Sequence, residues 1–240
     1  MSAASLDLRV LASLLRGLPR RAAHAESLQA FYGPQAERYD SFRERLLAGR
    51  RELIAMLAPP DGAHIVELGG GTARNLDYFG DRLGRMASVE VVDLCPALLD
   101  IARRRTATLP NVRIIESDAA TYRPSVPVDC VYLSYALTMM PDWRSVLDNA
   151  RAMLRPGGVL GVVDFYIGKA APAPGDARHG AFTRHFWPRW FAHDGVRLTP
   201  DHLARLRELF PQHIRQERRA PVPYLPGLRV PYYLFLGRRP

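Results

Sequence analysis

The sequence has little lysine and cysteine and no long hydrophobic run. Its 240 residues include one lysine, Lys169, and two cysteines, Cys95 and Cys130. The cysteines lie far apart and form no CxxC pair, so the sequence predicts neither a disulfide framework nor a metal site and indicates a reducing compartment. No stretch approaches the ~20 apolar residues of a membrane-spanning helix. The apolar stretch 10–15 is also too short for a secretion signal, so we expect a cytoplasmic protein.

The positive charge of the chain comes almost entirely from arginine. The net charge of +9 suits a nucleic acid, an anionic membrane or an acidic partner subunit. A GC-rich genome would also favour arginine over lysine, but that alternative does not explain why the net charge is positive. Residues 6–18 carry leucines at helical spacing, with arginines on other faces. This pattern predicts a helix that either packs on the domain or a sister subunit, or lies on a membrane surface.

Prolines at positions 59 and 60 divide the chain into two predicted parts. Residues 1–58 form a helical N-terminal extension, and residues 59–240 form an α/β domain. In that domain, apolar runs alternate with helical patterns, which predicts a mostly parallel sheet with helices on both faces. The predicted strands begin near residues 64, 87, 112, 128 and 159, and helices are expected at 73–82, 96–105, 143–154 and 201–210. Residues 213–222 and 229–238 predict a hairpin at the end of the chain.

A glycine-rich turn follows the first predicted strand. It lies within Glu67–Asn75, which has the sequence ELGGGTARN, and glycine allows both a sharp turn and close approach of a ligand to the backbone. Asp93, at the end of the second strand, can accept hydrogen bonds from two ribose hydroxyls. Arg74 stands where the dinucleotide fingerprint requires its third glycine, which argues against NAD, and no phosphate-binding P-loop motif is present.

The segments ELGGGTARN, VVDL, ESDA and SYAL resemble the successive motifs of class I S-adenosylmethionine methyltransferases. The resemblance implies a Rossmann-like, seven-stranded, mostly parallel sheet that ends in an antiparallel hairpin, with a helical N-terminal cover. It implies S-adenosylmethionine as cofactor and S-adenosylhomocysteine as product. Ala73 departs mildly from the family, which often has glycine there. The cofactor-binding residues implied are Tyr32, Tyr39, Glu67, Gly69, Gly70, Gly71, Asp93, Leu94, Asp118, Ala119 and Ser134.

Three residues at strand ends are the predicted catalytic groups: Tyr135, Asp164 and Tyr166. The resemblance places Tyr135 beside the transferred methyl group. A carboxylate near an amine acceptor can take or relay its proton, which is the role predicted for Asp164, although a helix cap or a buried acceptor is the alternative. A nucleic-acid acceptor is not expected, because residues 134–137 lack the Asn/Asp-Pro-Pro-aromatic tetrad of base-amine methylases.

The segments SYALTMMPDW, GVVDFY, WPRWFAHDGVRL and PYLPGLRVPYY resemble the bacterial betaine-lipid methyltransferases. This resemblance implies trimethylation of the homoserine amine of diacylglyceryl homoserine, at an anionic inner-membrane surface, with an aminocarboxypropyl-transferase as partner enzyme. The substrate-binding residues that we predict are Met139, Trp143, Tyr224, Arg229 and Tyr232. Arg229 is either a clamp for the homoserine carboxylate or part of a structural salt bridge. The alternatives are a methyltransferase for a soluble small molecule or quinone, and a non-enzymatic cofactor-binding protein. The sequence also leaves open whether the protein forms a homo-oligomer.

Overall fold

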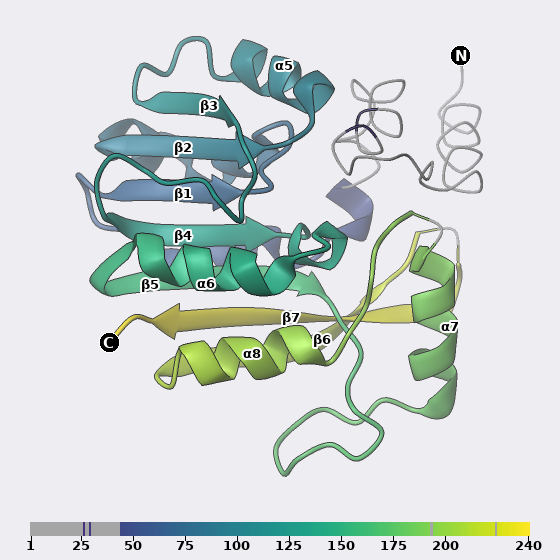
Figure 1. The fold of residues 1–240 in the computed structure, drawn as a ribbon. Coiled ribbons are helices and arrows are strands. Elements are labelled where there is room, and N and C mark those ends of the chain that lie inside the picture. The colour runs from purple at the N-terminus through teal and green to yellow at the C-terminus, as the bar shows by residue number, and fades with distance from the viewer. Residues whose placement is uncertain (1–25, 27–28, 30–43, 193, 224) are drawn as a thin grey trace, which may run out of the picture.

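The computed structural model describes residues 26, 29, 44–192, 194–223 and 225–240 (Figure 1). The helix expected at residues 6–18 lies outside these ranges, as do Tyr32, Tyr39 and Tyr224.

The centre of the molecule is a seven-stranded sheet with the order β3-β2-β1-β4-β5-β7-β6. Its first five strands are parallel, and β7 pairs antiparallel with both β5 and β6. This topology confirms the predicted Rossmann-like sheet with its C-terminal hairpin. The strands are β1 (His64–Leu68), β2 (Ser88–Asp93), β3 (Val112–Glu116), β4 (Val128–Ser134), β5 (Leu154–Phe165), β6 (His213–Pro221) and β7 (Arg229–Arg238).

Helices cover both faces of the sheet, and each face has its own hydrophobic core. On one face, α4 (Arg50–Leu57), η2 (Arg74–Arg85) and α5 (Pro96–Arg105) contribute to a core that includes Leu53 and Phe79. On the other face, α6 (Trp143–Met153) and α8 (Asp201–Leu209) pack against a core that includes Leu147 and Leu206. In Figure 1, α6 and α8 lie side by side in front of the sheet. The nearly continuous burial of β1 and β4 follows from this double cover.

Two helical segments differ from the sequence prediction. The helix expected at 73–82 is a 3₁₀ segment, η2, whose path is kinked at Gly80, where φ is +55°. Helix α7 (Ala181–Ala192) was not predicted, because its two rows of aromatic residues and Pro188 give no simple amphipathic period. It lies beyond the carboxyl ends of the parallel strands (Figure 1).

The parallel strands β1, β2 and β4 all end at the same edge of the sheet (Figure 1). The short 3₁₀ helix η3 (Leu137–Met139) follows β4 at this edge. The loops after parallel strands converge there, which is where ligands bind in open α/β sheets. No helix in the described part of the chain is long and apolar enough to cross a bilayer.

Candidate functional site

A pocket of about 220 Å³ opens at the carboxyl edge of the parallel strands. It lies between the loops that follow β1, β2, β3 and β4, so its walls come from four separate parts of the sequence. Its described lining residues are Gly69, Gly71, Val92, Asp93, Leu94, Cys95, Leu98, Ser117, Asp118, Ala119, Ala120, Tyr135, Ala136, Met139, Met140, Pro141, Asp142 and Val146.

The floor of the pocket is the glycine-rich turn after β1. The φ angles of Gly69 and Gly71 are +70° and +55°, in the left-handed region that favours glycine. A Cβ atom on Gly69 would lie 2.5 Å from the Cβ atom of Ala136, so the turn and the segment after β4 touch only because no side chain is there. Ala73, where the resemblance leads us to expect glycine, also has a left-handed φ, +57°.

Asp93, at the end of β2, fixes the backbone on two sides of the pocket. One carboxylate oxygen accepts a hydrogen bond from the Gly71 N–H at 2.8 Å, and the other accepts from the Cys95 N–H at 2.9 Å. A carboxylate has about four acceptor positions. Asp93 can therefore hold the turn and also accept hydrogen bonds from a ligand in the pocket that it lines.

The loop after β3 forms the opposite wall and is held by a buried asparagine. Asp118 accepts the Ala120 N–H at 2.8 Å, which shapes the loop. The side-chain amide of Asn149, on α6, donates to the carbonyl oxygens of Ala119 and Tyr122. Asn149 was not among the predicted site residues, because an isolated asparagine in a helical pattern carries no signal in the sequence.

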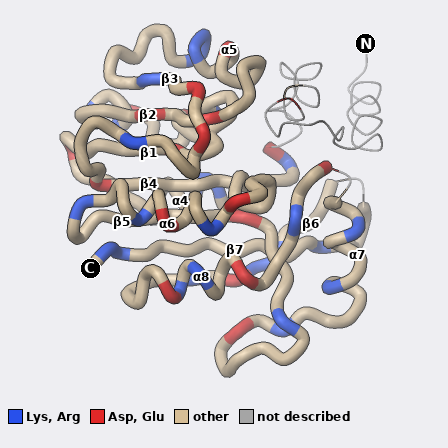
Figure 2. Tube along the Cα trace, in the orientation of Figure 1, with Lys and Arg blue, Asp and Glu red and all other residues tan. Residues whose placement is uncertain are grey.

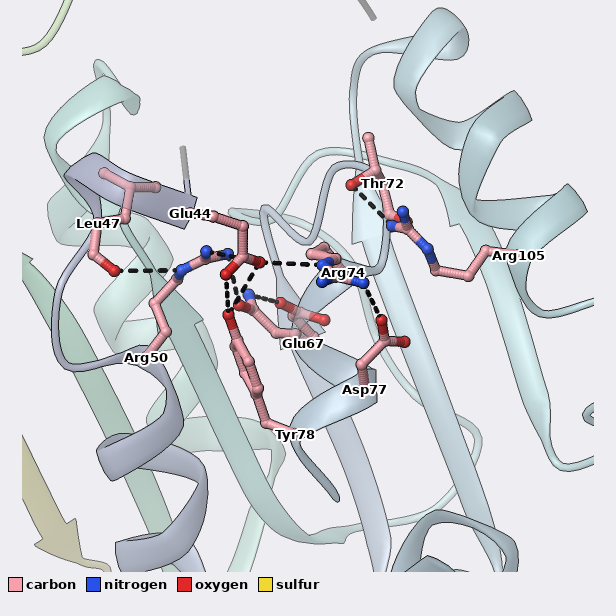
Figure 3. Close-up of polar contacts among 10 residues, drawn as sticks. Glu44, Leu47, Arg50, Glu67, Thr72, Arg74, Asp77, Tyr78 and Arg105 are labelled. Carbon is pink, nitrogen blue, oxygen red and sulfur yellow. Dashed lines mark hydrogen bonds and ion pairs between the residues drawn. The ribbon is translucent and has the colours of Figure 1, made fainter. Parts of the chain in front are cut away.

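A polar network lies under the glycine turn and reaches the segment before α4 (Figure 3). Glu67 is fully buried, and its oxygens accept hydrogen bonds from the Asn75 side chain at 2.7 Å and the Tyr132 hydroxyl at 2.9 Å. Arg50 contacts Asn75 and forms an ion pair with Glu44. Figure 3 also shows the Arg74 guanidinium turned toward Glu44, at 2.9 Å. This network couples the entry to α4 with the backbone that forms the pocket floor.

Residues 65–158 match a family model described as a methyltransferase domain. Over 126 residues, the chain is 34% identical to a trans-aconitate 2-methyltransferase of Variovorax paradoxus and 29% identical to one of Azoarcus sp.. Each match covers 52% of this chain and 46% or 48% of the relative, so the chain spans about half the length of these curated relatives.

A solved structure shares the fold of nearly the whole chain. The N-methyltransferase NodS from Bradyrhizobium japonicum WM9, in complex with S-adenosyl-L-homocysteine, superposes with a TM-score of 0.63. The match covers 90% of this chain and 98% of NodS at 17% sequence identity, which shows the fold alone. None of these three names refers to a lipid, so they give no support to the betaine-lipid hypothesis.

The lining residues suit S-adenosylmethionine, the cofactor that the sequence predicts. Leu94, Leu98 and Ala119 provide apolar surface for a flat adenine ring. Asp93 provides acceptors for hydroxyl groups, and the glycines let a ligand approach the backbone. The contacts of each residue with the cofactor stay predictions.

Among the predicted cofactor residues, Glu67, Gly70 and Ser134 do not line the pocket in the described part of the chain. A Cβ atom on Gly70 would lie 3.0 Å from the Glu67 side chain, which places Glu67 beneath the turn rather than inside the cavity. The Ser134 hydroxyl is buried, and no described residue hydrogen bonds to it. Glu67 would thus act through the turn that it supports.

The structure separates the three predicted catalytic residues. Tyr135 lines the pocket with an unusual left-handed φ of +54°, and its hydroxyl donates to the Ala48 carbonyl oxygen at 2.7 Å. Asp164 is fully buried behind the pocket, where it accepts hydrogen bonds from the N–H and the hydroxyl of Thr138. Tyr166 lies in a second cavity, with its hydroxyl donating to Glu217 at 2.6 Å. Only Tyr135 is thus in place to touch a cofactor or acceptor in this pocket.

The predicted substrate residues are also dispersed. Met139 lines the pocket, whereas the ring of Trp143 packs edge-on against His202 at a centroid distance of 4.6 Å. Tyr232 is buried next to Gly49, and Arg229 is exposed on β7, where it donates to the Arg219 carbonyl oxygen. Asp142, Met140 and Pro141, which were not predicted, complete the lining next to Met139.

Burial raises the pKa of Glu67 to about 7 from an ordinary value of 4.5. The folded chain therefore binds this proton more tightly than the unfolded chain, and we expect the free energy of unfolding to fall as pH rises from 4.5 to 7. Glu67→Gln keeps the shape of the side chain and its two hydrogen bonds but cannot titrate. The fall in the free energy of unfolding with pH should therefore be smaller in this variant than in the wild type, by at most roughly 3 kcal/mol. The measurement is urea denaturation at pH 5 and pH 8.

Two other buried acids titrate in the same window, so the wild-type slope alone is not diagnostic. Burial raises the pKa of Asp164 to about 6 and that of Asp194 to about 7. The comparison of Glu67→Gln with the wild type isolates the Glu67 contribution. An unchanged slope in the variant would show that the unfolded and folded chains hold this proton equally.

Proposed function

We propose that the protein transfers the methyl group of S-adenosylmethionine to a small acceptor molecule. The convergence of the glycine turn, Asp93 and Tyr135 on one pocket supports this proposal. When bound, the cofactor supplies an activated methyl group that leaves its sulfonium by in-line displacement. The chain contributes position and exclusion of water. Tyr135 and Met139, which share the pocket wall, would bound the space where the acceptor meets the methyl group.

A small carboxylic acid is the first candidate acceptor, because the curated relatives are named for trans-aconitate. In that reaction a carboxylate oxygen would attack the methyl carbon, the carbon–sulfur bond would break, and no proton would need to leave the acceptor. The relatives match only about half of their length, so the acceptor does not follow from the likeness alone.

An amine, including the amine of diacylglyceryl homoserine, is the second candidate. Among the described lining residues, Asp93, Asp118 and Asp142 are acidic and none is basic. A polycarboxylate acceptor would gain no ion pair from these walls, whereas an ammonium group would. An amine must lose its proton before it attacks, and a carboxylate in the pocket can take or relay that proton. The resemblance to betaine-lipid methyltransferases supports this candidate as well.

The test is transfer of a labelled methyl group from S-adenosylmethionine to three acceptors: trans-aconitate, homoserine, and diacylglyceryl homoserine in detergent micelles. Label on trans-aconitate supports the acid, label on homoserine supports a soluble amine, and label in the lipid phase supports the lipid amine. Suppose that the chain binds the cofactor but labels none of these acceptors and nothing in cell extracts. That result would contradict the proposal and favour a non-enzymatic cofactor-binding protein.

A further inference from the structure

Helix α7 has two aromatic sides, and only one of them packs on the protein. Trp187 and Phe191 are buried, and the Phe191 ring stacks on Phe165 at 4.8 Å. The other side carries Phe182, Phe186 and Trp190, which recur every four residues and form a row along the helix. Phe182 is 60% exposed and Trp190 is 41% exposed. Exposed large aromatics arranged in a row mark an interaction surface rather than ordinary surface scatter.

The row is rigid before any partner arrives. The Phe182 and Phe186 rings stack at 4.9 Å with an interplanar angle of 13°, and the Phe186 and Trp190 rings stack at 5.7 Å. The buried side of α7 fixes the helix, because the Trp187 indole N–H donates to the Arg229 carbonyl oxygen. Little side-chain freedom is thus left to lose when the row is covered.

Basic residues lie on α7 and on the segments next to it, and α7 itself contains no acidic residue. Figure 2 shows blue and no red along α7. Five exposed or half-buried arginines lie on α7 or on the segments joined to it by hydrogen bonds. Arg219 donates to the Arg178 carbonyl oxygen, and Arg229 donates to the Arg219 carbonyl oxygen. No ion pair within the described ranges involves any of these arginines, which are Arg178, Arg184, Arg189, Arg219 and Arg229.

We propose that the row of Phe182, Phe186 and Trp190, with the arginines on α7 and on the segments next to it, docks on an anionic phospholipid surface. Phenylalanine and tryptophan rings insert at the level of the headgroups, and arginines beside them pair with lipid phosphates. The combination of apolar rings with uncompensated positive charge favours this partner over an uncharged protein surface. The proposal concerns docking only and does not depend on which acceptor is methylated.

The surface also has a direct structural link to the pocket. Phe191 of α7 stacks on Phe165, and the Phe165 ring packs edge-on against Tyr135 at 4.6 Å. Tyr135 lines the pocket. Three aromatic side chains in contact, those of Phe191, Phe165 and Tyr135, would therefore connect a membrane bound at α7 with the pocket.

The experiment is co-sedimentation of the full chain with vesicles of equal parts phosphatidylglycerol and phosphatidylcholine, compared with vesicles of phosphatidylcholine alone. We expect binding only to the anionic vesicles, and weaker binding at high salt. The double variant Phe182→Ser/Trp190→Ser should lower the affinity at least tenfold. Arg184→Gln/Arg189→Gln should lower the affinity about 25-fold, since each arginine contributes about a factor of five.

Matched variants keep the comparison specific to α7. Ile214→Ser removes another exposed apolar residue, 57% exposed on β6, and Arg103→Gln/Arg104→Gln removes two charges from α5. Both should bind vesicles like the wild type, and circular dichroism should show that all four variants are folded. Wild-type binding that the α7 variants leave unchanged, or equal losses in the matched variants, would overturn the proposal. Two other results would also overturn it: no binding of the wild type to anionic vesicles, or α7 variants that lose self-association but bind vesicles as before.

Discussion

Replacing Gly69 with alanine is expected to lower the affinity for S-adenosylmethionine at least tenfold and to destabilise the fold. The φ angle of +70° already costs an alanine about 1 kcal/mol. The added Cβ atom would lie 2.5 Å from the Ala136 Cβ and 2.9 Å from the Met140 Cε, both on the segment after β4. Since real atoms do not approach so closely, the turn and that segment must separate, and both line the pocket. Calorimetric titration and thermal unfolding measure the two effects.

Gly62→Ala is the matched control for this substitution. Gly62 has a similar φ of +78°, but nothing lies within 4 Å of the position that its Cβ would occupy. The Gly62→Ala variant should lose about 1 kcal/mol of stability through backbone strain, and it should bind the cofactor like the wild type. If Gly69→Ala and Gly62→Ala had the same affinity, the close approach of the two pocket walls would have no role in binding.

Replacing Asp93 with alanine is expected to weaken cofactor binding by about 1–3 kcal/mol, a loss of roughly 5- to 150-fold. The variant removes the acceptor predicted for the ribose hydroxyls. It also leaves the Gly71 and Cys95 N–H groups without the carboxylate that holds them at 2.8 and 2.9 Å. Both effects act on the same pocket, so the loss should exceed that of an ordinary surface change. Isothermal calorimetry gives the affinity.

Two further variants interpret that result. Asp100→Ala removes an exposed acid of α5 whose ion pair among the described residues is with Arg103, and the variant should bind the cofactor normally. Asp93→Asn keeps one acceptor oxygen, so its affinity for the cofactor should lie between that of Asp93→Ala and that of the wild type. An unchanged affinity in Asp93→Ala would contradict the ribose prediction, even if the glycine turn proved less stable.

The strands and the glycine turn could be predicted from the sequence, because each depends on local pattern. The apolar runs that became β1, β2 and β4 mark buried parallel strands, and the glycines of ELGGGTARN mark a turn with positive φ. Segment 73–82 was misassigned as an ordinary helix, because Gly80 interrupts it and the 3₁₀ geometry has no separate sequence signature.

The buried polar contacts were less accessible to prediction. Asn149 holds the Ala119 loop from a helix thirty residues later, and Thr138 holds Asp164 from the segment after β4. Asp164 was predicted as a catalytic group from its place at a strand end, yet that strand end faces a buried site rather than the pocket. Which way a strand-end side chain points depends on the loop packed against it.

The sequence by itself determined the order of the strands along the chain, the place of the tight turn and the acids at the ends of β2 and β3, because these follow from periodicity and from the conformational freedom of glycine. Only the tertiary structure decided that Glu67 lies beneath the turn, that Asp164 and Tyr166 lie away from Tyr135, and that α7 buries one aromatic side and exposes the other. The physical reason is that burial and hydrogen-bond partners arise from contacts between segments far apart in sequence, which no local pattern encodes.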